Sequence, residues 1–100
     1  MGTMVPDALT SAHTVVTVGN VSTTVLAANA ARQYALFIND SDEAMYLSFD
    51  GTAAALNDGV RLNANGGSFE MSTRVGNICQ ALVVGICASG SKKILVTEGV

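Results

Sequence analysis

The chain has 100 residues, the size of a single domain, with 49% hydrophobic but only 5% aromatic residues and a net charge of −3. Charged residues make up 13%, against about a quarter in ordinary globular domains, which predicts a surface covered by copies of the chain or by a partner. The few basic residues form no stripe, and no apolar run is long enough to span a bilayer. Nucleic acid and membrane are therefore excluded as partners.

Residues 1–12 show no hydrophobic period and contain the only proline, Pro6. They also lack the basic and apolar regions of a secretory signal. We predict that residues 1–12 form an N-terminal arm that is ordered against a neighbouring molecule. Residues 13–100 then form a single β-sandwich domain.

The next segments are β-branched runs separated by turn residues. His13–Val18 and Val21–Ala27 are rich in Val and Thr and flank the turn residues Gly19 and Asn20, which predicts a first hairpin. The alanine-rich stretch Ala28–Arg32 is too short for an independent helix, and we interpret it as a connection.

Gln33–Asn39 is the clearest core strand of the sequence. Apolar residues occupy both of its faces, so we predict a strand that is covered on both sides. The two faces carry Tyr34, Leu36 and Ile38 on one side and Ala35 and Phe37 on the other. The turn residues Asn39–Asp42 follow, and Ala44–Phe49 completes a predicted second hairpin.

The second half of the chain supplies further short strands. The alanines of Thr52–Leu56 predict one helical turn, and Gly85 inside a long apolar run predicts a bulge or a close backbone contact. The predicted strands are Val60–Leu62, Ser68–Ser72, Ile78–Ala88 and Lys92–Glu98. Seven or eight short strands with turns about every 8–12 residues predict an all-β fold, a small antiparallel β-sandwich or barrel that is jelly-roll-like.

The residue types that carry chemistry are isolated from one another. His13 is the only histidine and has no partner at the spacing of a metal or acid–base site. In a straight strand Cys79 and Cys87 would lie roughly 26 Å apart, too far for a disulfide. We interpret them as small buried hydrophobes of a protein assembled in a reducing cytoplasm. The sequence thus offers no catalytic, cofactor-binding or metal-binding residues, and we predict that the protein is not an enzyme.

Two turns imitate ligand sites. Asn39, Asp40, Asp42 and Glu43 are arranged like oxygen ligands of a calcium loop, but the glycine and the final glutamate of an EF-hand are missing. We favour a purely structural turn, with weak calcium binding as the alternative. The Asn65–Gly67 turn imitates a phosphate nest, but neither a helix nor a basic residue accompanies it, so turn geometry is the better account.

Four segments carry distinctive motifs: an Arg after the alanine-rich connection, an Asn-Asp-Ser-Asp turn, an Arg-Leu-Asn-Ala-Asn-Gly-Gly turn and a Thr-Glu-Gly ending. They are Ser22–Asp42, Ala44–Phe49, Gly59–Ser72 and Ile94–Gly99. Together these segments resemble a family of small virion structural proteins of tailed bacteriophages. The resemblance covers neither residues 1–13 nor Ile78–Ala88.

The resemblance implies a virion component assembled in the cytoplasm of a bacterial host. Within that class we expect a capsid decoration (cement) protein on the outer surface of the head, bound as a homotrimer to the major capsid protein. One alternative is a tail, collar or head-fibre component. Another is a cell-surface or carbohydrate-binding β module, but the chain has no Trp, and Tyr34 and Tyr46 occupy expected core positions.

Overall fold

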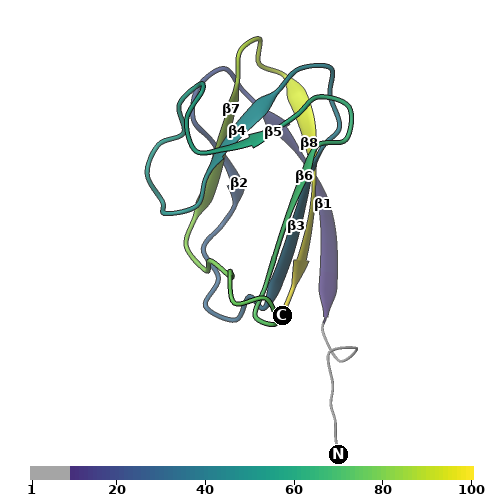
Figure 1. Cartoon of the computed structure of the whole chain (residues 1–100), viewed down its shortest axis with the longest axis vertical. Helices are drawn as coiled ribbons and strands as arrows, with labels where there is room; N and C mark the ends of the chain where they lie inside the picture. The colour runs from purple at the N-terminus through teal and green to yellow at the C-terminus, as the bar shows by residue number, and fades with distance from the viewer. Residues whose placement is uncertain (1–9) are drawn as a thin grey trace, which may run out of the picture.

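The computed structural model describes residues 10–100 of the chain. This part contains eight β-strands in two antiparallel sheets, joined by turns and loops. The strands are β1 (Ser11–Val18), β2 (Thr23–Leu26), β3 (Tyr34–Asn39), β4 (Met45–Ser48), β5 (Val60–Leu62), β6 (Ser68–Ser72), β7 (Val83–Cys87) and β8 (Lys92–Gly99). Sheet A has the order β1-β8-β3-β6, and sheet B has the order β2-β7-β4-β5. The two sheets pack face to face (Figure 1), which confirms the all-β sandwich.

Both predicted hairpins are wrong. β1 pairs with β8 and β2 pairs with β7, so the Gly19-Asn20 turn carries the chain from one sheet to the other. The turn after β3 does the same, because β3 lies in sheet A and β4 in sheet B. Turn residues fix where a chain reverses, but the choice of layer depends on which strands the apolar faces meet. Within residues 10–100, β4 and β5 are the only consecutive strands that pair with each other.

The N-terminal boundary also differs from the prediction. β1 begins at Ser11, and Thr10 exchanges two backbone hydrogen bonds of 3.0 Å with Val100. Residues 10–12 therefore belong to the domain, because the end of β8 supplies backbone partners that side-chain patterns do not reveal. The rest of the predicted arm, residues 1–9, lies outside the described residues.

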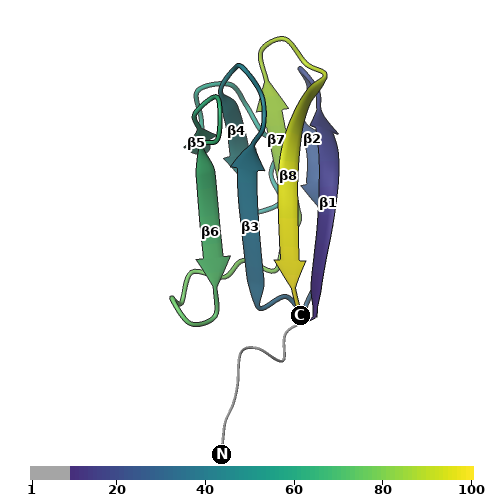
Figure 2. The ribbon, with the colours of Figure 1, turned by 90° about the vertical axis from the view of Figure 1, so that its right-hand side faces the viewer.

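The core lies between the sheets, and β3 contributes one of its faces to it. On β3, Ala35 and Phe37 are fully buried, whereas Tyr34, Leu36 and Ile38 are half-buried on the outer face. The prediction of a strand covered on both sides is therefore wrong, because nothing among the described residues is layered over sheet A (Figure 2). Aromatic side chains join the layers, with the ring centroids of Phe37 and Phe49 5.6 Å apart.

β7 is the one strand whose five residues are all buried. At its centre, a Cβ atom on Gly85 would lie 3.0 Å from side-chain carbons of Leu47 and Val25. The close neighbours are therefore side chains, and not another backbone as was predicted. The irregularity of pairing falls on β2, between Thr24 and Leu26. β7 is also shorter than predicted, because residues 78–82 pair with no strand.

The segment 78–82, which precedes β7, binds the side chain of a buried arginine. Arg32 is 0% exposed, and its Nε donates to Glu98 at 2.8 Å. Its terminal nitrogens donate to the carbonyl oxygens of Cys79, Ala81 and Ala27. Arg32 thus joins β8 of sheet A to the segments that flank β2 and β7 of sheet B. The predicted Ala28–Arg32 connection is confirmed, but the burial of its last residue was not foreseen.

A buried side-chain amide also links the two sheets, at the other end of the sandwich. Asn39 is 0% exposed, and its Nδ2 donates to the carbonyl oxygens of Glu43 and Leu62 at 2.8 and 3.0 Å. Its Oδ1 accepts from the Ser41 hydroxyl at 2.6 Å. Each polar atom of this side chain therefore has a partner, which makes the buried amide compatible with a stable core.

Candidate functional site

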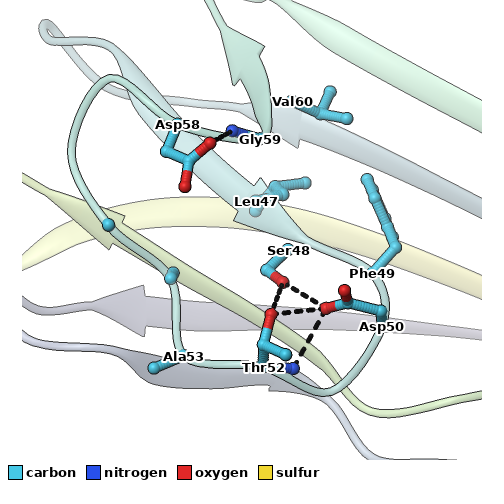
Figure 3. Close-up of a pocket in the computed structure, with 11 residues that line it drawn as sticks. Leu47, Ser48, Phe49, Asp50, Thr52, Ala53, Asp58, Gly59 and Val60 are labelled. Carbon is cyan, nitrogen blue, oxygen red and sulfur yellow. Dashed lines mark hydrogen bonds between the residues drawn. The ribbon is translucent and has the colours of Figure 1, made fainter.

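A pocket lies beneath the loop Phe49–Gly59, which joins β4 to β5 (Figure 3). Its volume is about 380 Å³, and its lining includes three alanines of the loop, the carboxylates Asp50 and Asp58, and apolar residues at the ends of β4 and β5. The predicted helical turn at Thr52–Leu56 is absent, because this stretch runs without helical hydrogen bonds over the pocket.

The carboxylates of this pocket are engaged by their own loop. Asp50 accepts hydrogen bonds from the Ser48 hydroxyl and from the amide and hydroxyl of Thr52 (Figure 3). These bonds, led by the one from the Thr52 hydroxyl, lower the pKa of Asp50 to about 2. Asp58 accepts from the amide of Gly59 at 2.9 Å. Both side chains therefore accept hydrogen bonds from their own loop and stabilise its turns.

The acidic turn after β3 distributes its side chains among separate partners. Asp42 forms an ion pair of 2.7 Å with Lys92, and this hydrogen bond lowers the pKa of Asp42. Glu43 accepts from the amide of Ser89 at 2.7 Å, which lowers the pKa of Glu43. Within residues 10–100, no three His, Cys, Asp or Glu side chains are grouped to hold a metal ion. The turn joins β3 to the β7–β8 loop, and calcium binding gains no support from its geometry.

The glycine-rich turn connects β5 of sheet B to β6 of sheet A. Asn65 and Gly66 have positive φ angles of 61° and 107°, and a Cβ atom on Gly67 would overlap the backbone of Asn63. The amides of Asn65 and Gly66 donate to the carbonyl oxygens of Ser41 and Asn39. Since these amides are already used, the turn offers no phosphate nest.

His13 and the cysteines occupy separate parts of the molecule. His13 is exposed on β1, with its Nδ1 2.9 Å from the Thr97 hydroxyl. Cys79 and Cys87 are both free thiols. Cys79 was predicted to lie on a strand, but it precedes β7, which begins only at Val83. Burial raises the pKa of the Cys87 thiol, which makes it a poor nucleophile.

The placement of both tyrosines differs from the prediction. Tyr34 and Tyr46 are half-buried on the outer faces of the two sheets. Their hydroxyls donate to Glu70 and to Asn57 respectively. Sequence alternation suggested core positions because both strands have apolar residues on each face.

The outer face of sheet A carries an apolar row that crosses three strands. Val15 pairs with Leu95, and Leu95 pairs with Ile38. Val15 is 61% exposed, and the row borders a hollow of about 250 Å³. This row and the adjoining β1 edge were missed, because an alternating strand gives no sign of which of its faces remains open.

No family model, curated protein or solved structure matches this chain. The described residues, 10–100, include no helix that is long and apolar enough to cross a membrane.

Proposed function

We propose that this protein is a structural component of a tailed-bacteriophage virion, namely a decoration protein on the outer surface of the head. The segments that resemble small phage virion proteins supply the class. The observation that carries the surface role is the apolar row of Val15, Leu95 and Ile38, because apolar patches left open on soluble proteins mark interaction surfaces.

The proposed mechanism is repeated burial of surface without catalysis. Copies bound at junctions of the major capsid protein would each bury an area typical of a specific interface. Binding to the assembled shell, and not to its separated subunits, stabilises the shell by mass action. The two free thiols agree with assembly in the reducing cytoplasm of the host.

The copy number per particle tests this proposal directly. A decoration protein is present on the order of hundreds of copies, because it follows the symmetry of the shell. Quantitative mass spectrometry of purified virions should find this number, and a reconstruction should show density on the outer head surface that disappears without the gene. About a dozen copies or fewer would contradict the proposal and favour the tail, collar or head-fibre alternative.

The carbohydrate-binding alternative gains one observation from the structure. Tyr46 lies on the outer face of sheet B, and its hydroxyl donates a hydrogen bond to Asn57, which belongs to the loop over the pocket of Figure 3. Titration calorimetry with cell-surface glycans, with Tyr46→Ala as the matched variant, tests this alternative. Binding that is lost in the variant would support it.

A further inference from the structure

The two edges of sheet A are finished differently. β6 forms one edge, and the side chain of Asn77 covers it by accepting from the Ser72 amide at 2.8 Å and donating to the Glu70 carbonyl at 3.1 Å. β6 also carries the charge of Glu70, and charged side chains discourage pairing at an edge. Folding thus protects this edge against a further strand.

β1 forms the other edge and has no such protection. Its sequence, SAHTVVTV, contains no acidic residue, lysine, arginine or proline, and it runs for eight residues without a bulge. Figure 2 shows β1 as the outermost strand of its layer. None of the described residues pairs with its outer side.

The hydrogen-bond ladder identifies which groups are open. Thr10 and Val100 form a reciprocal hydrogen-bonded pair, and such pairs alternate along antiparallel strands. Ser11, His13, Val15 and Thr17 therefore direct their backbone N–H and C=O groups away from β8. These residues are neighbours on one side of an extended strand, so they present a regular row of donors and acceptors.

We propose that this edge binds the same edge of a second copy of the chain, so that two sheets A join across a two-fold axis into one continuous sheet. The edge is self-complementary when Thr14 lies on the axis, because Ser11 then meets Thr17 of the second copy and His13 meets Val15. All four open residues are paired in this register, which gives about eight hydrogen bonds. A shift by two residues leaves one open residue of each strand without a partner.

The side chains agree with this register. Thr14 faces Thr14 of the second copy, and paired threonines are favourable neighbours across strands. The outer faces of the two sheets align, and on that face Val15 lies opposite His13 of the second copy. No like charges meet along the strand, although the chain as a whole carries a net charge of −3. A second copy therefore fits this edge without a charge penalty.

Sedimentation of the full chain over a range of concentrations tests the proposal. We expect a reversible dimer with a micromolar Kd, because an interface built on one strand is small. Thr14→Lys and Thr14→Glu should each weaken dimerisation by at least about tenfold, since like charges would face each other on the axis. An equimolar mixture of these two variants should recover a heterodimer. A monomer at every concentration, a trimer in solution, or two variants that do not recover association on mixing would overturn the proposal.

A cysteine pair tests the register independently of charge. Across a non-hydrogen-bonded antiparallel pair the Cα atoms lie about 4.5 Å apart, within the range that a disulfide bridges. Thr14→Cys should form a covalent dimer on mild oxidation. Ala12→Cys, exposed on the same face of the same strand, is the matched control and should not, because Ala12 faces Val16 of the second copy. Equal cross-linking of both variants would overturn the two-fold register.

This two-fold contact is separate from attachment to a phage head. A chain that dimerises through β1 but is absent from virions retains this inference and refutes the proposed function. A chain that decorates heads but never pairs through β1 does the reverse.

Discussion

The two edge strands of sheet A, β6 and β1, differ in how their unpaired backbone N–H and C=O groups are treated. At β6, a side chain from the following turn occupies the open backbone groups and a carboxylate stands beside them. At β1, a strand without Asp, Glu, Lys or Arg, four residues direct backbone groups outward, and none of the described residues pairs with them. Since an open edge invites another strand, the difference indicates that pairing is prevented on one side and permitted on the other.

The largest expected effect comes from a substitution that destabilises β8, because β8 is the strand with which β1 pairs. Glu98 lies on β8, opposite Ala12 of β1. Arg32→Ala removes the buried ion-pair partner of Glu98. It also leaves three backbone carbonyl oxygens without their hydrogen-bond donor. We expect a loss of about 3–5 kcal/mol in the free energy of unfolding, measured by urea denaturation.

Glu98→Gln is the matched control for that change. It removes the charge of Glu98 but keeps an acceptor for Arg32, and Glu98 is partly exposed at 19%. Its effect should be clearly smaller. Equal losses in both variants would show that the ion pair, and not the set of carbonyl bonds, stabilises this end of the sandwich.

A second substitution should expose the backbone groups of β6 that the Asn77 side chain covers, so that this edge resembles the β1 edge. Asn77→Ala removes both hydrogen bonds that the side chain makes to the backbone of Ser72 and Glu70. We expect a loss of about 1–2 kcal/mol in stability and faster hydrogen exchange of the Ser72 amide. Asn77→Asp keeps the acceptor for that amide and should preserve more of its protection. Unchanged exchange in Asn77→Ala would contradict the covering role of this side chain.

The smallest effect concerns the charge on β6. The hydrogen bond from the Tyr34 hydroxyl to Glu70 raises the pKa of Tyr34 above its usual value of 10.0. A raised pKa in the folded state stabilises the fold below pH 10, and this contribution is lost as the pH rises through the folded-state value. Glu70→Gln should lower the Tyr34 pKa toward 10, as followed by ultraviolet absorbance. A Tyr34 titration unaffected by the substitution would contradict the contact.

Much of the fold could be predicted from the sequence, because strands leave local patterns. The β-branched run of β1 and the alternation of β3 are visible in short windows, as are the turns at Asn39–Asp42 and Asn65–Gly67. Local patterns do not specify which sheet receives each strand, so both hairpins were assigned wrongly.

The residues that matter most at the edges and ends depend on distant partners. Arg32 meets Glu98 and the segment before β7, far along the chain, so no spacing pattern announces its burial. Whether β1 lies at an edge depends on the pairing of β8 with both β1 and β3. Exposure of Tyr34 and Tyr46 likewise follows from the absence of a third layer among the described residues.

Hydrogen exchange of the β1 amides at low and high protein concentration tests the central claim most directly. The amides of His13, Val15 and Thr17 point away from β8, so they should exchange rapidly in the dilute monomer and become protected as the concentration rises. The amides of Thr14 and Val16, which face β8, should be protected at both concentrations. Rates for His13, Val15 and Thr17 that do not depend on concentration would contradict pairing of two copies through this edge.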